Sequence, residues 1–324
     1  MRLTILATTV FLCFTACQHV EPAKKTIRTP APVHTHPPVH THEESLPVHP
    51  GGKTIASLPA RWTDANPEAL KKDIIIYVPG SGNQTCDGIQ LGNGFSTYAA
   101  PVATGKFWQE TLALAGYDVL AYDKRVGTTG PAALADDLDA ACDAVRARFR
   151  GRREIILWSS EQGTQVILSS RCLHQAKAIV LLSPIPDSLD RVWISGLKEA
   201  GLRDRALSLS ATFESIRKGQ FESDAKVMGA TLTFWRNWMK TADATANLLD
   251  SLKIPALFVV GQNDVWLGSY GRGVIKRIAS NKANRKMIVI ESGDRALLRK
   301  DALSPSGAET IVLALESLGK VNGR

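Results

Sequence analysis

The segment from Arg153 to Ser170, REIILWSSEQGTQVILSS, constrains the fold more than any other part of this sequence. A short apolar, β-branched run typical of a buried strand passes through SSEQG directly into an amphipathic helical pattern. This strand-turn-helix has the pattern of a nucleophile elbow, a tight turn that exposes the residue at its apex. Such a turn tolerates only small residues two positions before and two positions after the apex.

Glu161 is the residue that this rule places at the apex, because Ser159 and Gly163 then fill the two crowded positions. With Ser160 at the apex, the crowded positions would hold a tryptophan and a glutamine, which the turn should reject. We therefore predict that Glu161 occupies the apex in a strained or left-handed conformation.

The chain between residues 53 and 324 alternates strand and helix patterns, which indicates an α/β fold with a mainly parallel sheet and helices on both faces. The alternation stops between 187 and 253, where we expect a helical lid inserted after the sixth strand. Its aromatic residues are expected to serve internal packing. The predicted strands are Asp73–Val78, Asp118–Tyr122, Glu154–Leu157, Ala178–Leu182, Ala256–Val260 and Lys286–Ile290, and the predicted helices are Phe107–Ala115, Ala132–Phe149, Thr164–His174, Gly271–Ala279 and Ala308–Leu318.

Four stretches in order resemble the α/β-hydrolase superfamily, and the segment FWRNWMKTADATANLLDSLKIPALFVVGQND at Phe234–Asp264 looks similar to that of its esterase- and aminopeptidase-like members. The four stretches are YVPGSGNQ at Tyr77–Gln84, AYDKRVGTTG at Ala121–Gly130 with Val126 in place of a usual glycine, the elbow, and LFVVGQNDVW at Leu257–Trp266. The resemblance implies the α/β-hydrolase fold from about Asp73 to Gly319. It also implies an oxyanion-hole-like set of backbone amides at Gly80, Ser81 and Gln162.

The three positions that carry the catalytic triad in this family are Glu161, Asp264 and Asp294 here, so the nucleophile and the histidine are both replaced. His174 is the one histidine after residue 52, and we expect it on the surface, far from the carboxyl edge of the sheet. A serine mechanism needs an imidazole base, and an aspartate of ordinary pKa is a poor base at neutral pH. The replacements favour a protein that binds a small molecule or a partner under its lid without standard serine hydrolysis. The alternative is an active hydrolase of esters or peptides with Glu161 or Ser160 as nucleophile.

Three carboxylates at one sheet edge repel one another, so something must compensate their charge. The candidates are a shared proton, an internal arginine such as Arg125 or Arg295, a bound Ca²⁺ or Mg²⁺, or a cationic ligand. We expect no cofactor and assign no metal ligands.

The first residues, MRLTILATTVFLCFTAC, are typical of a secretory signal peptide, because a single positive charge precedes an apolar run too short to span a bilayer. The end of this run resembles a bacterial lipobox. We predict a signal peptide over residues 1–16, lipidation of Cys17, and an exported protein anchored by lipid to the bacterial cell envelope.

Residues 17–52 contain many prolines, almost no large apolar side chain and six of the seven histidines. They predict an extended tether without regular packed structure. VHTHPPVHTH, with His34, His36, His40 and His42, suits a Zn, Ni or Cu tract or a solvated spacer, and the spacer is favoured because nothing in a tether fixes ligand geometry. The predicted organisation is signal peptide 1–16, tether 17–52, core 53–186 and 254–324, and lid 187–253.

The net charge of +8 suits an envelope protein that meets anionic lipids or polymers, and no nucleic-acid-binding pattern accompanies it. We expect a monomer whose partners are a small ligand or an envelope component, and the membrane through its lipid anchor. Cys142 and Cys172 fall at similar depths in two helices that the fold lays side by side, so a disulfide between them and a pair of buried thiols both remain open.

Overall fold

The computed structural model describes residues 39–49, 54–82, 84–89, 104–222, 225–294, 297–299, 302–303 and 305–320. The chain divides into two units, residues 1–38 and 39–324, and every described residue belongs to the second. The predicted signal peptide and Cys17 therefore lie outside the described residues. Among the helices that the structure describes, none is both long and apolar enough to cross a bilayer.

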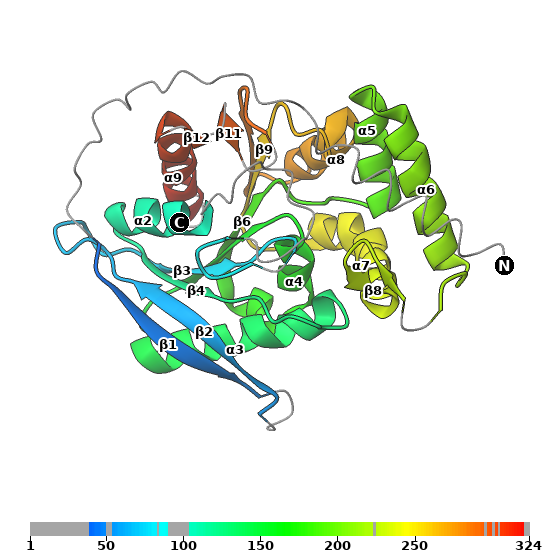
Figure 1. Cartoon of the computed structure of the whole chain (residues 1–324). Coiled ribbons are helices and arrows are strands. Elements are labelled where there is room, and N and C mark those ends of the chain that lie inside the picture. Colours follow the sequence, from blue (N-terminus) through cyan, green and yellow to red (C-terminus); the bar gives the residue numbers. More distant parts are fainter. Residues whose placement is uncertain are drawn as a thin grey trace, which may run out of the picture. The chain divides into compact units, whose positions relative to one another are not determined.

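An eight-stranded sheet forms the centre of this unit, in the order β1-β2-β4-β3-β5-β6-β9-β10. The strands from β4 to β10 in this order are parallel, whereas β1 (Thr41–Val48) and β2 (Ala56–Thr63) join one edge in antiparallel fashion (Figure 1). The six predicted strands are all present, and the predicted mainly parallel α/β sheet is confirmed. Their bounds are β3 (Ile74–Val78), β4 (Asp118–Tyr122), β5 (Ile155–Ser160), β6 (Ala176–Leu182), β9 (Ala256–Gly261) and β10 (Arg285–Ile290).

Helices cover both faces of the sheet, which is why the central parallel strands are apolar along their whole length. One face packs against α2 (Thr104–Leu114) and α9 (Pro305–Lys320). The other packs against α3 (Pro131–Phe149), α4 (Gly163–Ser169) and α8 (Gly268–Ser280). Figure 1 shows α2 and α9 together on one side of the strands and α3 on the other.

The predicted single helix from Thr164 to His174 is wrong in its second half. The helix α4 ends at Ser169, and Ser170 adopts an extended conformation (φ −91°, ψ 141°) before the short 3₁₀ helix η3 (Arg171–Gln175). The break is stabilised because the Ser170 hydroxyl accepts a hydrogen bond from the Cys172 amide at 3.0 Å. His174 is exposed in η3, just before β6 begins at the amino edge of the sheet, as expected.

The prediction of a tether without packed structure is wrong for its last part. Strand β1 (Thr41–Val48) pairs along its whole length with β2 (Ala56–Thr63), so the sheet begins inside the segment assigned to the tether. Leu46 and Val48, 1% and 0% exposed, belong to the main core cluster. Two inward apolar side chains are enough here because the ladder of backbone hydrogen bonds to β2 holds the strand.

Between β6 and β9 the chain forms helices and one small hairpin. The elements are a π-helical turn η4 (Asp190–Ile194), α5 (Ser195–Glu199), α6 (Arg203–Arg217), the strands β7 (Lys226–Val227) and β8 (Ala230–Thr231), and α7 (Leu232–Ser251). A further hairpin, β11 (Leu298–Arg299) and β12 (Ala302–Leu303), follows β10. The aromatic rings of the inserted helices pack against one another, with Trp193 edge-on to Trp235, Trp238 and Trp266. These rings thus serve internal packing, as predicted.

Cys142 of α3 and Cys172 of η3 form a disulfide, which decides between the two alternatives that the sequence left open. Their Cα atoms are 6.1 Å apart and the bridge closes a loop with a sequence separation of 30. Within the described residues Cys86 is a buried free cysteine, and burial raises the pKa of its thiol to about 12.

Candidate functional site

The elbow after β5 has the geometry that the sequence predicts. Glu161 is at the apex with a φ of 47°, in the left-handed region that a residue with a side chain adopts at a cost. Its amide donates to the Leu182 carbonyl at 2.9 Å, which fixes the apex against the end of β6. A Cβ atom on Gly163 would lie 2.8 Å from the Cβ of Ser159, so the turn does require glycine there.

The two serines before the apex, Ser159 and Ser160, lie at the end of β5 in different surroundings. Ser159 is fully buried within the sheet. Ser160 makes a side-chain hydrogen bond with Tyr77, whose pKa burial raises to about 12. A phenol of such high pKa stays protonated at neutral pH, so Tyr77 does not act as a base toward Ser160.

The loop after β3 places Gly80 against the elbow, as the family resemblance implies. A Cβ atom on Gly80 would lie 2.5 Å from the Ser160 hydroxyl oxygen. The Gly80 amide, a candidate oxyanion-hole donor, instead donates to the side-chain oxygen of Gln84 at 2.9 Å. The amide nitrogen of the same side chain donates to the Ser81 carbonyl at 2.9 Å. Gln84 thus occupies one of the donors that a hydrolase keeps for its substrate.

Lys124 is a charged residue that interacts electrostatically with Glu161 at the apex, and the sequence analysis did not single it out. It follows β4, and its ammonium donates to the Gly80 carbonyl at 2.8 Å and to the side-chain oxygen of Gln162. Burial lowers the pKa of this amine from 10.5 to about 7, and the nearby Glu161 carboxylate opposes that shift. The sequence did contain a signal for this role. Lys124 follows a buried strand by two residues, which places it at the carboxyl edge of the sheet.

Arg125, one of the two arginines expected to compensate the carboxylates, serves another group. Its guanidinium lies 3.0 Å from an oxygen of the fully buried Asp137 and also donates to the Ala133 carbonyl. Arg295, the other expected partner, lies outside the described residues. Within the part of the chain that the structure describes, Lys124 is a buried cation whose charge interacts with that of Glu161.

Asp264 and Asp294 follow the ends of β9 and β10, at the same edge of the sheet as Glu161. Asp264 is 2% exposed, and one of its oxygens accepts the amides of Trp266 and Leu267 at 3.0 and 3.1 Å. The turn after β10 packs closely on the end of β9, because a Cβ atom on Gly261 would lie 2.1 Å from the Asp294 carbonyl oxygen. The structure thus brings the three turns to one edge, with Asp294 partly exposed.

The fold is similar to that of several solved structures, among them three esterases. Est1E from Butyrivibrio proteoclasticus matches 85% of this chain and 98% of its own at 14% identity, with a TM-score of 0.55. A Pyrococcus furiosus esterase matches 92% and 98% at 16% identity and a TM-score of 0.55. A thermophilic esterase from Thermogutta terrifontis matches 86% and 99% at 15% identity and a TM-score of 0.54. The chain has the α/β-hydrolase fold.

At these identities the likeness concerns the fold alone, and the chemistry has to be argued from the site. No protein-family model and no curated protein matches the sequence. The α/β-hydrolase fold supplies the elbow, the loop after β3 and the turns after β9 and β10. In this chain a carboxylate occupies the apex, and a lysine and a glutamine side chain engage the groups around it.

Proposed function

We propose that this protein is a binding protein built on the α/β-hydrolase fold, which holds a small molecule or an envelope component beside its elbow and does not carry out standard serine hydrolysis. The single observation that carries the proposal is Glu161 at the apex of the elbow. The apex is the position from which the serine of a serine hydrolase attacks the substrate in this fold, and Glu161 has no hydroxyl to serve in that mechanism.

The surroundings of Glu161 support the same proposal. The Gly80 amide is engaged by Gln84, and the Lys124 amine is engaged by the Gly80 carbonyl and Gln162. A hydrolase site keeps such groups aimed at the position where negative charge develops. Here they form an internal polar network. A protein that stabilises no transition state does not need these groups for catalysis, so the network can stay intact.

The solved esterases suggest what the ligand resembles. An esterase scaffold shapes its carboxyl edge for a molecule with an ester or amide group, so we propose ligands of that class. The charge of the network adds one expectation. When a ligand carbonyl accepts a hydrogen bond from Lys124, it replaces the Gly80 carbonyl as the acceptor. The charge of Lys124 then still compensates the negative charge of Glu161.

A second candidate, an active hydrolase, rests on one specific observation. The Lys124 amine has its pKa lowered to about 7, and a base of that pKa accepts a proton well at neutral pH. Ser160 or Glu161 would then serve as the nucleophile.

A fluorophosphonate probe and a series of short p-nitrophenyl esters separate the two candidates. The wild-type chain, Ser160→Ala and Glu161→Gln should all stay unlabelled and turn over no ester above the buffer rate. Turnover by the wild type that disappears in Ser160→Ala or in Glu161→Gln would refute the binding proposal and identify the nucleophile. A thermal-shift screen with the same esters then seeks ligands, because a ligand that binds only the folded state raises the melting temperature.

We also propose that the protein is exported and anchored by lipid at Cys17, on the strength of the leader sequence. Expression in bacteria with an alkyne-tagged fatty acid should label the wild type and leave Cys17→Ser unlabelled. Labelling of both variants alike would refute the anchor.

A further inference from the structure

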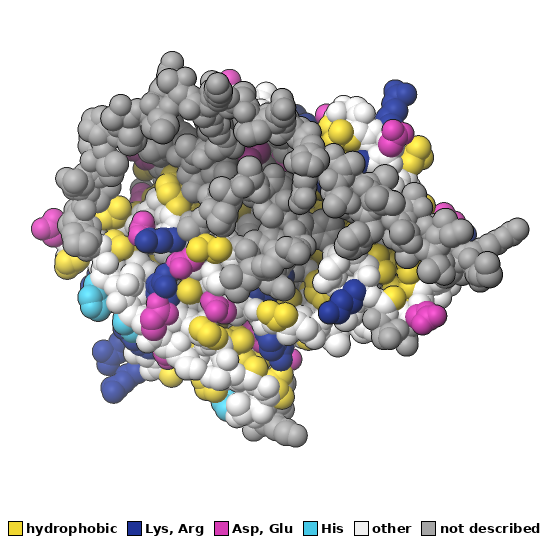
Figure 2. Space-filling model, in the orientation of Figure 1, with side chains coloured by type: hydrophobic (Ala, Val, Ile, Leu, Met, Phe, Trp, Pro, Cys, Tyr) yellow, Lys and Arg dark blue, Asp and Glu magenta, His cyan; other side chains and the backbone are white. Residues whose placement is uncertain are grey.

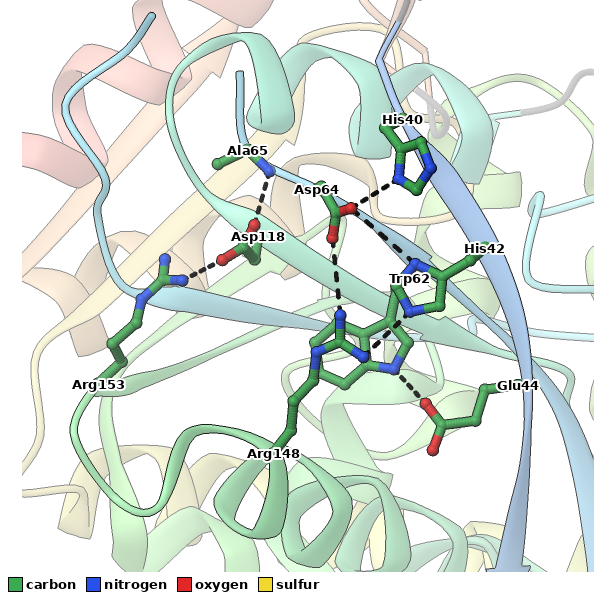
Figure 3. Close-up of polar contacts among 9 residues, drawn as sticks. All are labelled: His40, His42, Glu44, Trp62, Asp64, Ala65, Asp118, Arg148 and Arg153. Carbon is green, nitrogen blue, oxygen red and sulfur yellow. Dashed lines mark hydrogen bonds and ion pairs between the residues drawn. The ribbon is translucent and has the colours of Figure 1, made fainter. Parts of the chain in front are cut away.

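His40, His42 and Asp64 gather at the amino edge of the sheet, opposite the edge that carries the candidate site. His40 and His42 flank Thr41, so their side chains leave the same face of β1. Asp64 directly follows β2, and its amide donates to the His40 carbonyl at 2.9 Å. Figure 3 shows the three side chains turned toward one another above the two strands.

The three side chains offer one ligand atom each, and these atoms all lie within 4.8 Å of one another. The Nδ1 atom of His40 lies 2.7 Å from an Asp64 oxygen, and the Nδ1 atom of His42 lies 4.0 Å from the same oxygen. Ligands bound tetrahedrally to Zn²⁺ at 2.0–2.1 Å are about 3.3 Å apart. The observed separations bracket that value, so shifts of less than about 1 Å would bring the ligands onto an ion.

The backbone beneath the cluster is held in place, unlike that of a free histidine tract. The ladder of β1 with β2 fixes the strand positions of His42 and of the chain leading to Asp64. Directly after Asp64, the Ala65 amide donates to Asp118 at 2.6 Å, and Asp118 is in turn bound by Arg153. A preorganised backbone removes much of the ordering cost of metal binding.

We propose that His40, His42 and Asp64 form a binding site for Zn²⁺ or a similar divalent transition metal at this sheet edge. Two imidazoles and a carboxylate are ligands that Zn²⁺ prefers, and the three protein ligands leave a fourth position for water. The ion bridges the beginning of β1 to the end of β2. The site is independent of the proposed function, because it lies at the opposite edge of the sheet.

Arg148, at the end of α3, is the group that opposes a cation here. Its guanidinium stacks over the Trp62 ring at 4.6 Å and contacts His42 Nε2 at 3.1 Å. It also lies 3.9 Å from the other Asp64 oxygen, Oδ1. Metal binding through His42 Nδ1 puts a proton on Nε2, so the Arg148 contact with His42 is lost, whereas Arg148 keeps Trp62 and Asp64 Oδ1.

The cluster is accessible to an ion from solvent. The His40 side chain is 76% exposed, and those of His42 and Asp64 are 32% and 36% exposed. Figure 2 shows histidine side chains at the surface, beside basic and acidic ones. An incoming ion therefore needs no opening of the fold. His49, just after the far end of β1, serves as a matched control, since its Nδ1 lies 2.7 Å from the Thr54 hydroxyl.

The test is titration of the full chain with Zn²⁺ by calorimetry, with Co²⁺ absorption as a second readout. In a parallel background, His34 and His36 are replaced by alanine. These two histidines lie outside the described residues, and their replacement excludes that they bind the ion instead. One ion should bind in both backgrounds, Asp64→Asn should weaken its affinity at least about tenfold, and His49→Ala should leave it unchanged. Arg148→Met, which removes the charge and keeps the stem, should bind more tightly than wild type.

Two results would overturn the proposal. One is Zn²⁺ binding of equal affinity in Asp64→Asn, and the other is binding that vanishes when His34 and His36 are replaced. Each variant is first checked by circular dichroism and a melt in a chelator. Should Asp64→Asn fail to fold, His40→Gln replaces it, because the exposed His40 side chain contributes least to packing.

Discussion

Lys124 makes the stability of the protein depend on pH in a way that can be calculated and tested. Its amine has a pKa lowered from 10.5 to about 7, chiefly by burial. The folded state therefore binds fewer protons than the unfolded state between these two pH values. The free energy of unfolding then rises with pH through that window, and the cost of burying the charged amine is present in full below it.

The size of the effect follows from the two pKa values. A pKa lowered from 10.5 to about 7 corresponds to about 5 kcal/mol at 1.36 kcal/mol per pH unit. Between about pH 6 and about pH 9, the free energy of unfolding should therefore rise by roughly 2–3 kcal/mol. Lys124→Met removes the titrating amine and keeps a side chain of similar length, so this gain should be missing from the variant.

The assay is urea unfolding of wild type and Lys124→Met over this pH range, with the difference between the two taken at each pH. The subtraction cancels other titrating groups, such as Tyr77 and Cys86, whose pKa values burial raises to about 12. The wild type should gain stability relative to the variant as pH rises. Parallel curves, with a constant difference, would refute the reasoning and show that the amine is solvated.

Two further predictions concern the body of the fold. Cys142→Ser/Cys172→Ser should lower the free energy of unfolding by about 3–4 kcal/mol, the loop-entropy value for a separation of 30 residues, and a reductant should lower the wild-type melting temperature but not that of the variant. Burial raises the pKa of Asp137 to about 7 in spite of Arg125, so folding takes up a proton and stability falls as pH rises from about 4 to 7. Arg125→Met should cost little through this pair at about pH 5, where Asp137 is protonated with or without the arginine, and increasingly more above about pH 7, where the arginine stabilises the ionised carboxyl. Urea unfolding at about pH 5 and about pH 9 measures this, and an equal cost at both would contradict it.

The sequence was sufficient for the parallel sheet and the elbow because both depend on local patterns. The run IIIYV at Ile74–Val78 is buried on both faces, and such a short continuous apolar pattern is typical of a strand inside a parallel sheet. The elbow follows from steric demands within five residues, and so Glu161 was predicted at the apex. Strand β1 was missed because only Leu46 and Val48 are fully buried in it, and because its position depends on pairing with β2, which a local pattern does not reveal.

The partners of the site residues were harder to predict, because they depend on how separate loops meet. Lys124 reaches the Gly80 carbonyl and Gln162 from a third loop. The structure was therefore needed to see that this lysine, rather than the expected Arg125, interacts with Glu161. The hydrogen bond from the Gly80 amide to Gln84 depends on the path of the loop after β3. Composition and spacing do not carry this information.

The elbow is specified by packing and not by chemistry, which makes one last prediction possible. Glu161→Ser should fold normally, because the apex conformation is imposed by Gly163 and by the Leu182 carbonyl. It should nevertheless stay unlabelled by a fluorophosphonate probe, since the family's histidine position holds Asp294 and a serine without a base loses about 10²–10⁴ in rate. Adding Asp294→His should produce slow labelling, and adding Gln84→Ala, which releases the Gly80 amide, should accelerate it. If Glu161→Ser alone were labelled as fast as these combinations, another group would already be serving as base, with Lys124 at its pKa of about 7 the first to replace.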